Sequence, residues 1–244
     1  MAMAQHSAAR EQMDAQDADP ASLRQSLRDI RHLNAMLGWT MFTTRVTASY
    51  VQSRGMHQFT LLDVGCGSAD IPRAIARWSR RQGMRADIVA TDNHPVMLAV
   101  AREVCADTPG VRIERQDALA LSYRDGSFDI ALCTLALHHF SRPDAVRLLR
   151  EMARVGRRVL VFDLVRSRLA HLGAIALTRA ARMDPMTRYD APLSVRRAYT
   201  AKELRAIAAE AGLRDARVDV RAPFRLSLSA SGYGVPTGEG KVAR

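Results

Sequence analysis

The sequence predicts an α/β fold built on a doubly wound, mostly parallel β-sheet. Short apolar runs of strand length alternate with longer helical segments between about residue 59 and residue 163. The connections are short, which is typical of parallel strands covered by helices on both faces. Right-handed crossovers then bring the carboxyl ends of the strands to one edge of the sheet, where ligands bind.

Seven strands are expected, and the last two form an antiparallel pair near the end of the chain. They cover residues 59–64, 87–91, 111–115, 128–134, 158–163, 217–220 and 224–229. Helices are expected at residues 23–37, 43–53, 71–81, 95–104, 143–153 and 201–210. The last helix begins at a capping box, in which Thr200 precedes Glu203, and Gly212 ends it.

The 244 residues divide into one main domain and its appendages. Residues 1–20 are polar and aperiodic, so a disordered tail is expected there, followed by a helical lid at 21–57. The main domain covers 58–232 and contains an insertion at about 164–200, whose first half looks helical and whose second half looks like a loop. Residues 233–244 are expected to form a flexible tail.

The chain is strongly basic, with a net charge of +11 and 36 basic residues, of which only Lys202 and Lys241 are lysine. The arginines are spread along the chain without an aromatic and basic stripe, so nucleic-acid binding is not favoured. Cys66, Cys105 and Cys133 are scattered and odd in number, which indicates reduced thiols. With no signal peptide or membrane-spanning run, a cytoplasmic location is expected.

The strongest motif is LLDVGCGSAD at residues 61–70, where a buried strand enters a glycine-rich turn. Gly65 and Gly67 let the backbone approach a ligand closely. Dinucleotide-binding turns have a related layout, but Asp63 would repel an anionic pyrophosphate. The turn therefore favours a cationic ligand, and the alternative is a plain turn without any ligand.

Three further motifs follow later strands at the same edge. Asp92 ends the second strand and is placed to accept hydrogen bonds from a ribose, or else to cap the next helix. Asp117 and Ala118 follow the third strand, where a carboxylate suits an adenine amine or is simply solvated. His138 and His139 follow the fourth strand as candidate general bases, or else as packing residues.

Together these motifs, from about residue 59 to residue 163, resemble the class I S-adenosylmethionine (SAM)-dependent methyltransferases. The pattern is similar to the small-molecule branch related to the quinone-biosynthesis methyltransferases. The resemblance implies a Rossmann-like sheet of seven strands, with SAM as cofactor and S-adenosylhomocysteine as product. One departure is Ala69, where many members have a third glycine.

The resemblance also implies contacts to each part of the cofactor. Asp63 would meet the amino group of SAM, and Asp92 would hold the ribose. The turn with Gly65, Cys66 and Gly67 would line the methionine moiety, and the backbone at Cys133 and Thr134 would close its other side. Asn93 and Met97 would pack near the adenine, and Asp117 with Ala118 would meet its amine.

The acceptor is expected to be a small aromatic or lipid-like molecule, because the helical lid at 21–57 and the insertion at about 164–200 are both rich in apolar residues. O-methylation assisted by His138 or His139 is the first hypothesis, and C-methylation of a quinone-type ring is the second. A nucleic-acid methyltransferase and a binding module without activity are the weaker alternatives. No carboxylate cluster can be assembled, so no metal is predicted. Arginines at 166, 168, 179 and 182 allow peripheral membrane contact, and the sequence leaves the oligomeric state open.

Overall fold

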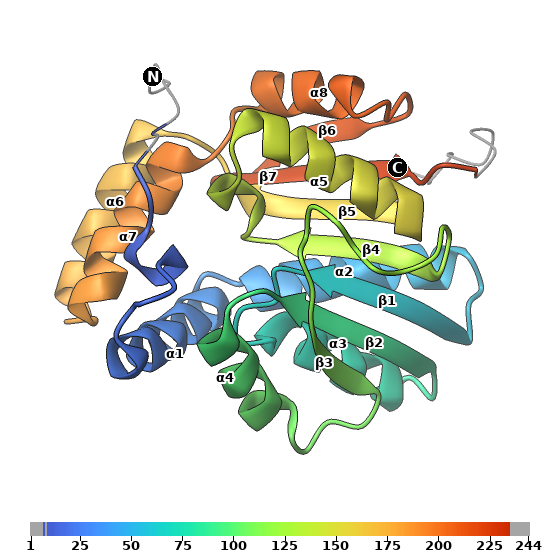
Figure 1. Cartoon of the computed structure of the whole chain (residues 1–244), viewed down its shortest axis with the longest axis horizontal. Coiled ribbons are helices and arrows are strands. Elements are labelled where there is room, and N and C mark those ends of the chain that lie inside the picture. Colours follow the sequence, from blue (N-terminus) through green and yellow to red (C-terminus); the bar gives the residue numbers. More distant parts are fainter. Residues whose placement is uncertain (1–6, 8, 235–244) are drawn as a thin grey trace.

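The computed structural model describes residue 7 and residues 9–234. Its centre is a single sheet with the strand order β3-β2-β1-β4-β5-β7-β6 (Figure 1). The strands are β1 (Gln58–Val64), β2 (Arg85–Asp92), β3 (Val111–Arg115), β4 (Phe128–Thr134), β5 (Gly156–Leu164), β6 (Arg217–Arg221) and β7 (Arg225–Ser231).

Strands β1 to β5 are parallel, whereas β7 runs antiparallel to both β5 and β6. The predicted seven-stranded, mostly parallel Rossmann-like fold is therefore confirmed. The chain order places the carboxyl ends of β1, β2, β4 and β5 along one edge of the sheet. The crossover from β1 outward to β3 and then back to β4 opens a crevice at this edge.

Helices cover both faces of the sheet because their apolar side chains repeat at helical spacing. Helices α5 (Arg142–Val155) and α8 (Ala201–Glu210) bury one apolar cluster against the sheet. Helices α2 (Trp39–Ser53) and α3 (Asp70–Arg81) bury another on the opposite face. Helix α4 (Pro95–Cys105) packs against β2 and β3.

The insertion after β5 forms two packed helices, α6 (Arg168–Ala180) and α7 (Pro185–Arg197). The second half was expected to be a loop, and that expectation is wrong. Asp184 caps α7 by accepting a hydrogen bond from the amide of Met186, and Pro185 suits the first helical turn. Packing against α6 and α1 (Pro20–Met36) stabilises the helix despite the internal Pro192.

The N-terminal segment, residues 9–19, lies against α7 (Figure 1) instead of forming the disordered tail expected over residues 1–20. It contains a short 3-10 helix, η1 (Gln12–Asp14), and buries Glu11 and Met13. The carboxylate of Asp190 on α7 accepts hydrogen bonds from the amides of Gln12 and Met13 at 2.8 and 3.0 Å. Residues 1–6 and 8, and most of the expected C-terminal tail (235–244), lie outside the described residues.

Within residues 9–234, no helix has the length and hydrophobicity that crossing a bilayer requires.

Candidate functional site

The turn after β1 brings three carboxylates together at the crevice. Gly65 and Gly67 have φ angles of 74° and 51°, and Ala69 also adopts a left-handed conformation with φ 55°. The amide of Gly67 donates a hydrogen bond to the Asp92 carboxylate at 3.0 Å, which ties the turn to the end of β2. Ala69 thus occupies a left-handed conformation that glycine would adopt without strain.

Burial raises the pKa of all three carboxyl groups. Asp63 lies in the interior, and burial followed by the charges of Asp70 and Asp92 raises its pKa well above 3.8. Burial also raises the pKa of Asp70 and of Asp92, although hydrogen bonds to both oppose the shift. Oδ1 of Asp63 is buried and has no hydrogen-bond partner among the described residues. This part of the crevice therefore suits a ligand that brings positive charge and hydrogen-bond donors.

A cavity of about 570 Å³ extends from this turn to the N-terminal segment and the α6–α7 insertion. Its volume is in the range of ligand-binding pockets. Apolar side chains from two helical regions line the part of the cavity away from this turn. They are Leu27, Ile30, Leu33 and Leu37 of the α1 region, and Leu169 and Leu177 of α6. The cavity thus joins an acidic end to an apolar end.

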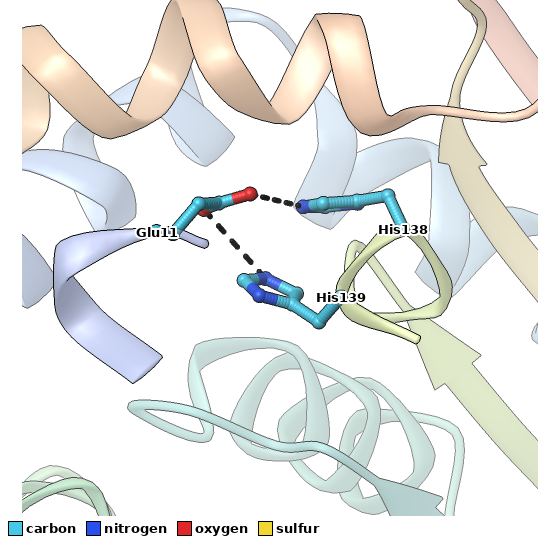
Figure 2. A group of neighbouring side chains, drawn as sticks. All are labelled: Glu11, His138 and His139. Carbon is cyan, nitrogen blue, oxygen red and sulfur yellow. Dashed lines mark ion pairs between the residues drawn. The ribbon is translucent and has the colours of Figure 1, made fainter. Parts of the chain in front are cut away.

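Two histidines in the 3-10 helix η2 (Leu137–His139) also line this cavity, and Figure 2 shows both of them beside Glu11 of the N-terminal segment. Leu135, just after β4, has a φ of 53°, and this left-handed residue turns the chain into η2. Asp163 at the end of β5 accepts a hydrogen bond from the amide of His138 at 2.9 Å, and its Oδ1 lies 2.7 Å from Nδ1 of the same residue. Because a carboxylate is an acceptor, Nδ1 of His138 carries the proton. Its Nε2 lies 3.7 Å from Oε1 of Glu11, another residue that lines the cavity.

His139 is held by the N-terminal segment. Its Nδ1 lies 2.9 Å from Oδ1 of Asp14, and its Nε2 lies 3.9 Å from Oε2 of Glu11. Burial would lower the pKa of His139, but the negative charge of Glu11 and the hydrogen bond to Asp14 outweigh it and raise the pKa to about 9. Burial would raise the pKa of Asp14, but its contacts with His139 lower it.

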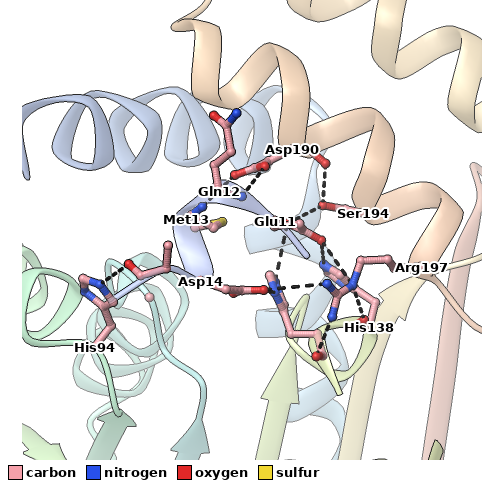
Figure 3. A network of polar contacts seen from close by, with 12 residues as sticks. Glu11, Gln12, Met13, Asp14, His94, His138, Asp190, Ser194 and Arg197 are labelled. Carbon is pink, nitrogen blue, oxygen red and sulfur yellow. Dashed lines mark hydrogen bonds and ion pairs between the residues drawn. The ribbon is translucent and has the colours of Figure 1, made fainter. Parts of the chain in front are cut away.

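A polar network fixes the N-terminal segment over the histidines (Figure 3). Ser194 donates a hydrogen bond to Oε2 of Glu11 at 2.9 Å. Arg197 donates to the backbone carbonyls of His138 and His139 at 3.0 and 2.6 Å, and also to that of Ala9 at 2.8 Å. One buried guanidinium thus joins η2 to the N-terminal segment.

Most of the candidate residues named from the sequence line this cavity. They are Asp63, Gly65, Cys66, Gly67, Asp92, Asn93, Met97, Ala118, Thr134, His138 and His139. Asp117 does not line it, because its side chain is exposed and accepts a hydrogen bond from the amide of Leu119. Cys133 is buried within the core under the cavity floor, whereas its neighbour Thr134 reaches the cavity.

Four site residues were not identified from the sequence. Asp70 and Asp163 could have been identified from the sequence, because Asp70 follows the turn after β1 and Asp163 lies near the end of β5, both at the ligand-binding edge. Nothing in the sequence points to Glu11 and Asp14, since they belong to a polar segment without periodicity. Only their tertiary contacts bring them to the histidines.

Comparison with known proteins relates the glycine-rich turn and the segment from β1 to the start of β5 to methyltransferases. A family model described as a methyltransferase domain matches residues 61–158. The chain is 33% identical over 116 residues to the ubiquinone/menaquinone biosynthesis C-methyltransferase UbiE of Idiomarina loihiensis, a match that covers 45% of this chain and 43% of that protein. The chain therefore matches less than half the length of this relative.

Solved structures are similar over more of the chain, although their sequences have diverged. Human N-acetylserotonin methyltransferase in complex with SAM has a TM-score of 0.63 at 13% identity, covering 88% of this chain and 56% of that one. A putative O-methyltransferase from Nostoc punctiforme has a TM-score of 0.54 at 20% identity, covering 77% and 55%. At this identity the likeness shows the fold, and it agrees with the resemblance predicted from the motifs.

Proposed function

We propose that this chain, which carries a class I SAM-dependent methyltransferase domain, methylates a hydroxyl group on a small apolar acceptor. The observation that carries the proposal is one cavity that joins the acidic glycine-rich turn to the His138–Asp163 pair. The two ends of the cavity have different chemistry, and each suits one reactant.

The acidic end fits SAM. The unpartnered Oδ1 of Asp63 is an acceptor for the amino group, and Asp92 at the tip of β2 is an acceptor for the ribose hydroxyls. A Cβ atom added at Gly67 would meet nothing closer than Leu27 at 4.0 Å, so the turn leaves room for a ligand beside its backbone. When bound, SAM supplies an electrophilic methyl group on a positively charged sulfur.

The apolar end suits an aromatic or lipid-like acceptor, because leucines from α1 and α6 line it. The residues of this chain would hold the acceptor oxygen in line with the methyl group and exclude water from the reaction. His138 would accept the hydroxyl proton at Nε2, and the support for this role is the 2.7 Å contact with Asp163 that keeps the first proton at Nδ1. Asp163 also stabilises the imidazolium that forms.

The second candidate is C-methylation of a quinone-type ring. It is favoured by the printed name of the relative from Idiomarina loihiensis, which is a C-methyltransferase. An activated ring carbon attacks without losing a hydroxyl proton first, so His138 would matter less for this reaction.

The test is an assay of purified protein with labelled SAM and a panel of phenols, hydroxylated polyketides and demethylated quinones. Mass spectrometry and NMR of the product then identify the methylated atom. The proposal expects an O-methyl ether whose rate falls by about 100-fold or more in His138→Gln. A C-methylated product would favour the second candidate, and no SAM binding by calorimetry would overturn both.

A further inference from the structure

The two histidines of η2 and Glu11 of the N-terminal segment converge on one point, although Glu11 and His138 are 127 positions apart in the sequence. Nε2 of His138 lies 3.7 Å from Oε1 of Glu11, and Nε2 of His139 lies 3.9 Å from Oε2 (Figure 2). One ligand atom from each of the three residues lies within 4.8 Å of the others.

These three side chains have the ligand types and the exposure of a transition-metal site. Two imidazole nitrogens and one carboxylate are a recurring ligand set for zinc and related divalent ions. Ligands at about 2.1 Å from a tetrahedral ion lie roughly 3.4 Å apart, so the observed separations require side-chain movements of about 1 Å or less. All three residues line the cavity, which gives an ion a path of entry.

The other ring nitrogen of each histidine already has the support that metal-binding histidines need. Asp163 lies 2.7 Å from Nδ1 of His138, and Asp14 lies 2.9 Å from Nδ1 of His139. Such carboxylates orient the ring, and an ion that displaces a proton from Nε2 then meets a lone pair already directed toward it.

The third ligand has an unsatisfied atom. Glu11 is buried, with an exposed fraction of 2%, and its Oε1 has no hydrogen-bond partner among the described residues. Ser194 satisfies only the other oxygen, and the nearest guanidinium nitrogen, Nε of Arg197, is 3.8 Å from Oε1. The carboxylates of Glu11, Asp14 and Asp163 surround the imidazoles, and among the described residues the guanidinium of Arg197 lies against Glu11. Negatively charged side chains thus outnumber this guanidinium, which favours a bound divalent cation.

We propose that Glu11, His138 and His139 bind one divalent transition-metal ion of the zinc class and thereby fasten the N-terminal segment over the cavity. The ion would occupy Nε2 of His138, so the metal-loaded chain would lack the free base assigned above. Metal binding would thus hold the enzyme in a closed state in which that base is blocked. Binding itself does not depend on the proposed methyl transfer.

The test is a titration of the untagged full chain with CoCl₂, followed by displacement with ZnCl₂, in the absence of SAM and acceptor. Cobalt reports its ligands by visible absorption, whereas zinc is spectroscopically silent. We expect one Co²⁺ per chain with a tetrahedral or five-coordinate spectrum. Glu11→Gln and His139→Gln should each weaken binding by more than about 100-fold, because loss of an outer hydrogen-bond partner alone costs about 10- to 100-fold.

The exposed His57 provides the matched control, since His57→Gln removes a histidine far from the site and should leave the affinity unchanged. A second measurement follows tryptic cleavage after Arg10, which Zn²⁺ should slow in the wild-type chain but not in Glu11→Gln. Circular dichroism of each variant checks that the domain has folded. Equal Co²⁺ binding by wild type and Glu11→Gln, or no stoichiometric binding by the wild type, would overturn the proposal.

Discussion

Replacing Asp63 by asparagine should change stability and cofactor affinity in opposite directions. The folded protein raises the pKa of Asp63 above 3.8 through burial and then through the charges of Asp70 and Asp92. The native state therefore keeps a proton that the unfolded chain has already released, so stability falls as the pH rises from about 3.8 through the folded pKa. Asparagine has nearly the same shape and no charge, so Asp63→Asn removes this loss at neutral pH.

The expected gain in the ligand-free protein is about 1 kcal/mol or more, which raises Tm by roughly 2–4 °C for a chain of this size. SAM binding should weaken in the same variant, because the amino group loses a charged hydrogen-bond partner worth about 1.5–3 kcal/mol. This corresponds to a roughly 10- to 150-fold increase in Kd. Differential scanning calorimetry measures the first effect, and isothermal titration calorimetry with SAM measures the second.

The control is Asp125→Asn, which makes the same chemical change at an exposed carboxylate paired with Arg154. It should leave the Kd for SAM unchanged and lower Tm only slightly, since surface ion pairs contribute little. If Asp63→Asn bound SAM as tightly as the wild type, Asp63 would not be the partner of the amino group. A Tm below that of the wild type would show that the carboxylate stabilises the empty turn.

Three further predictions concern the glycine-rich turn, the His138–Asp163 pair and the cap of α8. Gly65→Ala should lower the free energy of unfolding, measured by urea denaturation, by about 1–2 kcal/mol. The φ angle of residue 65 is 74°, and the new Cβ would lie 2.7 Å from Cβ of Ala136. A variant as stable as the wild type would refute this turn geometry. Asp163→Asn should lower the rate of O-methylation by about 10-fold or more with little change in the Kd for SAM. The carboxamide offers a single acceptor oxygen to the backbone amide and Nδ1 of His138, and it has no charge to stabilise the imidazolium. An unchanged rate would count against the His138–Asp163 pair. Thr200→Ala should cost about 1 kcal/mol on thermal unfolding, since the hydroxyl that accepts a hydrogen bond from the amide of Glu203 is lost, whereas the backbone half of the capping box remains. No change in Tm would contradict that role of the hydroxyl.

The local pattern of the sequence determined the parallel sheet and the cofactor end of the cavity. Strand-length apolar runs, capping residues and glycines act within a few residues of chain, so the bounds of β3 and β4 follow from them directly. Asp63, Asp92 and the histidines each follow a strand, and parallel strands place their carboxyl ends at one edge. Their proximity could thus be predicted from sequence order alone.

The conformations of the second helix of the insertion and of the N-terminal segment depend on tertiary contacts and could not be predicted from the local sequence. The sequence of α7 contains Pro185 and Pro192 and many polar residues, so its local pattern is that of a loop, and packing against α6 and α1 stabilises the helix. The segment around Glu11 has no periodicity, and its conformation depends on hydrogen bonds to α7.

The sequence alone therefore determined the α/β fold, the acidic glycine-rich turn and the two histidines at the same edge. Only the tertiary structure decided which carboxylates face those histidines. Asp14 and Glu11 reach His139 across more than a hundred residues of chain, and no local propensity encodes such a contact. Burial and charge compensation, which act between segments distant in sequence, fix that part of the site.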